Sequence, residues 1–396
     1  MTSEEEVTRW RVVILGVAIS AFGAFLQFKL PPVLPAFLAE FPHDAEVAAG
    51  FMSVFALVGL LASAPLGRLL DRRALIQALG AGLVFAALGI LLGLIAPYSA
   101  TAMLTARGAE GLTFAIFALI GPVIANRGAA RRDLGLVTGL IAAWIPIGQL
   151  VAGLLALAGA DWQALWLTNL ALIPVLGLAG FLLRDNLGPR AITALPLPAA
   201  TASSSALARQ ARPDRALVIG GGIFLLWSLQ FFAFMTWLTK YLTGELGLAA
   251  RAAILAYLLP VVVVMLFNVL TGWALARGLG LMKALVAALL LQGFVWLAAP
   301  HADGLFGVAL LIAYGIGAGV APACFFHLPH HLARGGVPVG ARAYGVLMTG
   351  RNCGVFLGPI VMALLFQGAL GWSGAALVIA GICAAAAGLA LTLKLR

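Results

Sequence analysis

The chain has 396 residues, of which 63% are hydrophobic and 10% are charged, and its formal net charge is +10. Soluble domains carry roughly 25% charged residues, and a mean hydropathy of +1.08 is more apolar than the interior of a soluble protein of this length can hold. The composition therefore excludes a soluble globular fold and indicates a protein embedded in a bilayer, where about 20 apolar residues cross the core as one helix.

Twelve apolar segments of about that length follow one another along the chain. They are residues 12–37, 48–66, 74–96, 100–126, 135–158, 163–183, 216–239, 252–271, 284–299, 304–326, 343–367 and 372–393. The predicted fold is an all-α integral membrane protein with twelve transmembrane helices.

The second half of the chain repeats features of the first. A glycine and an arginine recur in the stretches that follow the second and eighth segments, Gly67–Arg73 and Gly272–Gly278, and Leu26-Gln27-Phe28 matches Leu229-Gln230-Phe231. A proline-containing stretch rich in alanine and serine, residues 185–215, is predicted to be a cytoplasmic linker. We predict two pseudo-symmetric six-helix halves, 1–184 and 216–396, which is the architecture of a secondary transporter.

Basic residues predict the orientation in the membrane. With the N-terminus inside, the outer loops hold only Lys240 and Arg251 as basic residues, so the arrangement obeys the positive-inside rule and places both termini in the cytoplasm. The acidic N-terminus and the long first apolar segment indicate no cleavable signal peptide. The high arginine, alanine and glycine content is typical of a GC-rich bacterial genome, which indicates the inner membrane as the location.

No metal, cofactor or nucleic acid is expected as a partner. The net charge reflects topology and some attraction to anionic lipid, because no soluble face gathers the basic residues. Cys324, Cys353 and Cys383 lie in apolar segments without paired spacing. Three histidines near the end of the tenth segment resemble metal-ligand spacing, but a proline interrupts them: His327, Pro329, His330 and His331.

Four ionisable residues lie inside the predicted helices: Lys29, Arg107, Glu110 and Arg351. Each costs about 2.5–3.5 kcal/mol at a helix centre, so such residues usually face a cavity and serve function. Three cations against one carboxylate favour an anionic solute, because guanidinium groups bind carboxylates and oxyanions in a bidentate fork. Arg351, followed by Asn352 and without an acidic residue in its own helix, is the strongest candidate for solute binding.

Each of the other three has a structural alternative. Lys29 is near the outer end of its helix and could extend to the surface. Arg107 and Glu110 are three residues apart and could form an ion pair. Glu110 could exchange a proton during transport or stay ionised beside Arg107, and the sequence leaves both open.

Polar and aromatic residues complete the predicted solute pocket, although most aromatic residues in such a chain face lipid or other helices. The polar candidates are Gln27, Gln230 and Asn352, and the aromatic one is Trp144. Gly350, Gly354 and Gly358 recur one turn apart, which predicts close helix packing in lipid.

Two motifs resemble those of the major facilitator superfamily. Gly67 is followed four residues later by Asp71 and then by Arg72 and Arg73, and the fourth segment contains Arg107-Gly108-Ala109-Glu110-Gly111. The resemblance covers essentially the whole chain. It implies that the protein works as a monomer, and that Gly67, Asp71, Arg72 and Arg73 form a conformational latch that keeps the cytoplasmic side closed in the outward-open state.

The latch is expected to be one-sided, because Ala276 replaces the aspartate in the second copy. The alternative is that Arg72 and Arg73 only anchor the helix end among lipid headgroups.

The fifth segment separates two kinds of transporter. Exporters of this superfamily usually carry a glycine-proline step there, which is missing from Ala142–Gly148. The Trp-x-Pro-x-Gly arrangement is more similar to the cyanate-permease-like group of small-anion transporters.

The predicted function is proton-coupled uptake of a small organic or inorganic anion by alternating access. The alternative is a proton-driven exporter of drugs or metabolites, whose cationic substrates would require a carboxylate-rich cavity. An enzyme is not supported, because no nucleophile–base pair occurs at useful spacing, and a receptor is not supported by the short termini.

Overall fold

The computed structural model describes residues 7–70, 75–130, 133, 137, 140–141, 143–187, 215–332 and 341–393, with the backbone alone at 62–70, 276, 329–332 and 341–345. Throughout this part of the chain the regular structure is helical, and no strand occurs. Ten of its helices are long and apolar enough to cross a membrane, and Ala45–Leu61 and Trp144–Leu157 are shorter apolar stretches. The predicted all-α membrane fold is therefore confirmed.

The chain forms two compact units, residues 1–195 and 196–396. The helices of the first unit are α1 (Trp10–Phe28), α2 (Leu34–Glu40), α3 (Ala45–Leu70), α4 (Leu75–Ile95), α5 (Ala100–Gly128), α7 (Trp144–Leu157) and α8 (Trp162–Leu182), with short 3-10 turns η1 (Pro31–Val33) and η3 (Arg184–Asn186). Those of the second are α10 (Arg215–Gly244), α11 (Ala250–Ala276), α12 (Leu281–Ala298), α13 (Gly304–Leu332), α14 (Ala341–Gln367) and α15 (Gly371–Thr392), with η4 (Ala299–His301).

The same helix pairings recur in the two units, as the sequence repeat suggests. In the first unit α1 packs against α5, α7 and α8, and in the second α10 packs against α13, α14 and α15. The packing of α3 on α5, and of α4 on α5 and α8, has counterparts in α11 on α13 and in α12 on α13 and α15. Leu26-Gln27-Phe28 and Leu229-Gln230-Phe231 therefore lie on equivalent helices, α1 and α10.

The first apolar segment is not one continuous helix over 12–37. The helix α1 ends at Phe28, a 3-10 turn follows at Pro31–Val33, and α2 begins at Leu34. Two consecutive prolines cause this break, because proline lacks an N–H donor and its ring clashes with the carbonyl four residues before it. The break places Lys29 at the C-terminal end of α1.

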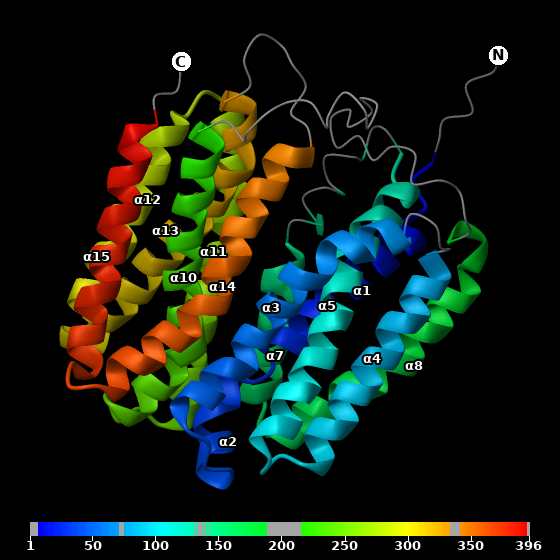
Figure 1. Cartoon of the computed structure of the whole chain (residues 1–396), viewed down its shortest axis with the longest axis horizontal. Coiled ribbons are helices and arrows are strands. Elements are labelled where there is room, and N and C mark those ends of the chain that lie inside the picture. Colours follow the sequence, from blue (N-terminus) through cyan, green and yellow to red (C-terminus); the bar gives the residue numbers. More distant parts are fainter. Residues whose placement is uncertain are drawn as a thin grey trace. The chain divides into compact units, whose positions relative to one another are not determined.

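The helices α10 and α14 lie side by side in Figure 1. At the glycines of α14 their backbones approach each other directly, with no side chain between them. A Cβ atom added to Gly350, Gly354 or Gly358 would lie 2.0, 2.1 or 2.3 Å from a carbonyl oxygen of α10. Lipid tails provide no hydrophobic drive between helices, so close van der Waals packing of small residues holds such pairs together. The predicted packing role of these glycines is confirmed.

We expect Gly354→Ala to destabilise the protein by about 1–3 kcal/mol, the usual cost of overpacking, because the Leu225 carbonyl at 2.1 Å is backbone and cannot rotate away. Gly381→Ala on α15 is the matched control, since nothing lies within 4 Å of the added Cβ there. Thermal unfolding in detergent, followed by size-exclusion chromatography, measures the difference. Equal midpoints for the two variants would contradict this account of the α10–α14 contact.

Candidate functional site

Three buried charged side chains form a cluster inside the first unit: Lys29, Arg107 and Glu110, each 0% exposed. Lys29 Nζ lies 2.6 Å from Glu110 Oε1, and Arg107 Nη1 lies 2.5 Å from Glu110 Oε2. One carboxylate therefore pairs with two cations, one on each oxygen. The cluster has a net charge of +1 in a membrane interior, where unpaired charge is costly.

Arg107 is held mainly by backbone carbonyl groups of two other helices. Its Nη1 donates to the Leu26 carbonyl at 2.8 Å, its Nη2 to the Gln27 carbonyl at 2.9 Å, and its Nε to the Phe51 carbonyl at 3.0 Å. The last carbonyls of a helix have no partner within it, and Pro31 has no N–H to offer Gln27. The guanidinium therefore caps the broken end of α1 and joins α1 and α3 to α5.

This arrangement uses all five N–H donors of the guanidinium. The carbonyls of Leu26, Gln27 and Phe51 account for three, Glu110 for a fourth, and Met52 Sδ, 3.9 Å from Nη2, for the fifth. The pairing with Glu110 is the structural ion pair that the sequence left open as an alternative. Direct contact between Arg107 and a solute stays a prediction, and it would require the guanidinium to give up one of these partners.

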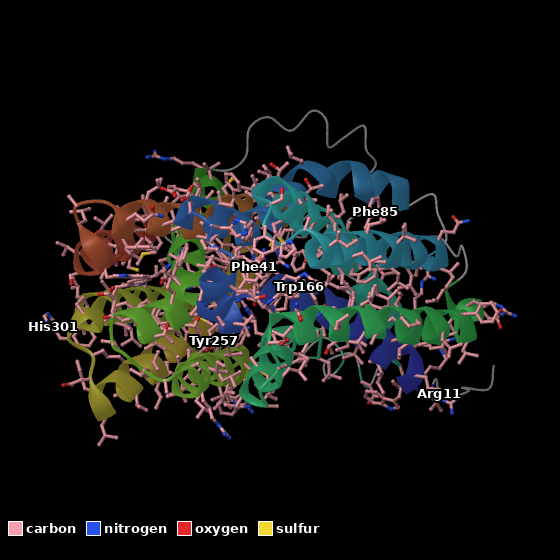
Figure 2. The ribbon with its side chains drawn as sticks, turned by 90° about the horizontal axis from the view of Figure 1, so that it is seen from below. Arg11, Phe41, Phe85, Trp166, Tyr257 and His301 are labelled. Carbon is pink, nitrogen blue, oxygen red and sulfur yellow. The ribbon has the colours of Figure 1, made fainter. Side chains whose placement is uncertain are left out.

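Lys29 points into the unit and does not extend to the surface. Its Nζ lies 3.8 Å from the ring centroid of Trp166 on α8, a cation–π contact. Figure 2 shows Trp166 among the interior side chains, and its side chain is 0% exposed. Trp166 was not predicted as a site residue, and only its position on an apolar helix near Asn169 could have drawn attention to it.

Several buried polar atoms of this unit have no hydrogen-bond partner among the described residues. They are Gln27 Oε1, Ser53 Oγ, Gln149 Nε2, Trp166 Nε1 and Asn169 Oδ1. Buried polar groups are nearly always satisfied by protein, water or a ligand. Gln27 is a predicted site residue, and its carbonyl already binds Arg107 while its side-chain oxygen stays available. Trp144, the predicted aromatic residue, begins α7 and packs against Phe114 with ring centroids 5.2 Å apart.

In the second unit, Gln230 belongs to a neutral network of amides and aromatic rings. Its Oε1 accepts hydrogen bonds from Trp296 Nε1 and from the Tyr314 hydroxyl, both at 3.0 Å. Trp227 Nε1 donates to Gln292 Oε1 at 3.0 Å. The Nε2 donors of Gln230 and Gln292 are buried without a partner in the described part of the chain. Gln292, Trp296 and Tyr314 were missed because they lie on helices far apart in sequence.

Arg351 of α14 is the candidate that has no counter-charge among the described residues. Its Nη1 donates to Asn352 Oδ1 at 3.1 Å, and its Cζ lies 5.9 Å from the Phe232 ring centroid. Both ion pairs found among the described residues involve Glu110, so no described carboxylate pairs with Arg351. Arg351 is only partly buried, and it can bind another ligand without breaking an ion pair to any carboxylate that the structure describes.

The latch and the histidines lie largely beyond what the structure describes. Gly67 belongs to α3 with its backbone alone described, and Asp71, Arg72 and Arg73 are outside the described residues. In the second copy of this motif, the Arg277 guanidinium stacks on the Trp273 ring, with Cζ 3.7 Å from the ring centroid.

The histidines at the end of α13 show no metal-ligand arrangement in the part that the structure describes. His327 Nδ1 forms a hydrogen bond with the Ala323 carbonyl at 2.8 Å. The described residues contain no group of three potential metal ligands.

Comparison with known proteins places this architecture in a family. The family model of the Major Facilitator Superfamily matches residues 13–341, so the chain belongs to that superfamily. It is a membrane transporter that works by alternating access and not an enzyme. No curated protein matches the chain.

Solved structures of superfamily transporters share the fold. A mutant of the nucleoside transporter NupG has a TM-score of 0.74 at 17% identity, covering 96% of this chain and 99% of that one. NupG itself gives 0.69 at 18% identity, with 97% and 100% covered. A bacterial homolog of the human lysosomal transporter Spinster, inward-facing and unoccupied, gives 0.78 at 12% identity, with 98% and 97% covered.

We expect Glu110→Gln to destabilise the protein far more than Lys29→Met. The first change leaves two buried cations without a counter-charge, and breaking a buried pair in this way costs about 3–5 kcal/mol. The second leaves Arg107 and Glu110 as a neutral pair. Thermal unfolding of the purified variants measures the order, with Glu245→Gln as a control at an exposed carboxylate. A Lys29→Met variant as unstable as Glu110→Gln would contradict the charge balance described here.

Proposed function

We propose that the protein imports a small organic or inorganic anion together with protons, across the cell inner membrane, as a monomer with both termini in the cytoplasm. The observation that carries this proposal is Arg351, a partly buried cation on a membrane helix to which no described carboxylate is paired. A carboxylate or oxyanion bound there would supply the missing counter-charge.

A second source of positive charge supports an anion. The Lys29–Arg107–Glu110 cluster has an excess charge of +1. Four of the polar groups without a partner among the described residues, on Gln149, Trp166, Gln230 and Gln292, are N–H donors. Anions accept hydrogen bonds and donate none when fully ionised, so donors without acceptors suit them. Asn352, which accepts from Arg351, orients the guanidinium beside the proposed binding position.

Proton coupling is proposed to act through the cluster as a whole. The sequence left open whether Glu110 carries the proton, and in the structure each of its two oxygens is paired with a cation. Arginine keeps its proton in proteins. The excess proton of the cluster is therefore the one on Lys29. Its release to water on the cytoplasmic side would leave a neutral amine beside a balanced Arg107–Glu110 pair.

Uptake into proteoliposomes under an inward proton gradient tests the anion, with a panel of small carboxylates, inorganic anions, nucleosides and lipophilic cations. We expect anion uptake to fall at least tenfold in Arg351→Ala, because a charge-assisted hydrogen bond contributes about 1.5–3 kcal/mol. Arg351→Lys should keep part of the activity, and Arg277→Ala, an exposed arginine, should keep all of it. Transport of cations that is indifferent to Arg351 would overturn the proposal and favour the exporter.

A change that keeps the charge but removes the exchangeable proton tests the coupling. We expect Lys29→Arg to bind the anion but to lose the dependence of uptake on the proton gradient, because guanidinium does not release its proton at accessible pH. Lys283→Arg, at an exposed lysine of α12, should retain normal coupling. Gradient-driven accumulation in Lys29→Arg equal to that of the unmodified protein would place the coupling elsewhere.

A nucleoside is the second candidate solute, and the aromatic network of the second unit favours it. Trp227 stacks on Phe231 with centroids 5.1 Å apart at 13°, and Phe231 is nearly parallel to Tyr314 at 6.5 Å and 12°. Rings with amides beside them are suited to a planar heterocycle, and one structural neighbour is a nucleoside transporter. Nucleoside uptake that survives Arg351→Ala but fails in Gln230→Leu would identify this solute instead of an anion.

A further inference from the structure

A cavity of about 300 Å³ lies within the second unit, where α10 ends and α13 begins. Most of its wall residues come from α10, α12, α13 and α15, with one residue each from α11 and α14. Its size is at the lower end of the range for small-molecule sites. Five aromatic side chains and one carboxylate contribute to the lining: Phe234, Trp237, Tyr241, Trp296, Trp372 and Asp303. Asp303 is the only charged residue among those that line the cavity, and it is exposed beside His301, which Figure 2 shows at the edge of the unit.

The polar atoms of three of these rings are already engaged with the protein. Trp237 Nε1 donates to the Pro359 carbonyl at 3.0 Å, and Trp296 Nε1 donates to Gln230 at 3.0 Å. The Tyr241 hydroxyl donates to the Ala299 carbonyl at 2.9 Å. These three residues therefore offer a ligand the faces and edges of their rings and no free hydrogen-bond donor.

The rings are held in place before any ligand enters. Trp372 stacks on Phe366 with centroids 4.1 Å apart at 4°, and Trp237 meets the same ring edge-on at 4.9 Å. Tyr241 packs against Trp372 at 5.3 Å. Fixed rings lose little conformational entropy on binding, which favours affinity.

Aromatic ring faces attract positive charge, and a lysine side chain already lies near one of the rings of this cavity. Lys240 Nζ lies 5.8 Å from the Trp237 ring centroid, within the range of a cation–π contact. Lys240 itself is not part of the lining. A carboxylate at the opening of an aromatic cavity adds a direct counter-charge for a ligand cation.

We propose that this cavity binds a small lipophilic organic cation, such as a quaternary ammonium or phosphonium, with apolar substituents among the rings and its positive centre toward Asp303. This cationic ligand has the opposite charge to the anion proposed to bind Arg351. The cavity is therefore a separate ligand site, and its ligand is not the transported solute. A bound cation would contact α10, α12, α13 and α15 at once and so stabilise their packing at this end of the unit.

Two probes of matched size and opposite charge test the proposal on the purified full-length protein. Equilibrium dialysis measures binding of tetraphenylphosphonium and of tetraphenylborate. We expect the phosphonium to bind at least fivefold more tightly than the borate, and Asp303→Asn to weaken its binding about fivefold. Asp303 directly precedes α13, and asparagine caps a helix N-terminus as well as aspartate does. The variant should therefore fold normally. Asp44→Asn, at an exposed residue just before α3, is the matched control and should leave binding unchanged.

Trp372→Leu, checked for folding by size-exclusion chromatography, should also weaken phosphonium binding. Equal binding of the two probes, or phosphonium binding that Asp303→Asn leaves unchanged, would overturn the proposal. The natural cation could be free or a choline headgroup of a lipid. Displacement of the phosphonium by phosphatidylcholine but not by phosphatidylglycerol would support the headgroup, and no displacement by either would support a free cation.

Discussion

The first unit depends on one buried guanidinium. Pro31 and Pro32 end α1 early and remove N–H groups that would have satisfied its last carbonyls. Arg107 donates to the carbonyl of Gln27, whose helical partner would have been Pro31, and also to the carbonyls of Leu26 on α1 and Phe51 on α3. A charge that is costly in a membrane interior thus compensates for backbone groups that would be equally costly there.

Glu110 makes that arrangement possible, because it balances Arg107 on one oxygen and Lys29 on the other. The cluster remains one charge in excess, and a buried group with excess charge responds to a proton or to an approaching anion. Structural support and the proposed role in solute coupling are therefore compatible in this cluster. Any movement that opens one contact changes the charge balance of the others.

The two units share one helix arrangement but differ in the chemistry of their interiors. Gln27 and Gln230 occupy matching stretches of α1 and α10, yet the first lies beside a charged cluster and the second beside tryptophan and tyrosine. The three buried charges of the first unit are paired with one another, whereas Arg351 of the second has no partner among the described carboxylates. Similar backbones thus hold different sites, as expected when function is carried by side chains on a common fold.

The sequence by itself determined the class of the protein, because hydropathy and segment length report the bilayer directly. It also identified Lys29, Arg107, Glu110 and Arg351, because ionisable residues stand out in apolar helices. The tertiary structure alone decided which of these residues pair, since Lys29 and Glu110 are 81 positions apart. It likewise decided that Trp166 covers Lys29, that Trp296 and Tyr314 bind Gln230, and that Gln292 binds Trp227. The physical reason is that helix periodicity specifies one face of one helix, whereas these contacts depend on how separate helices pack.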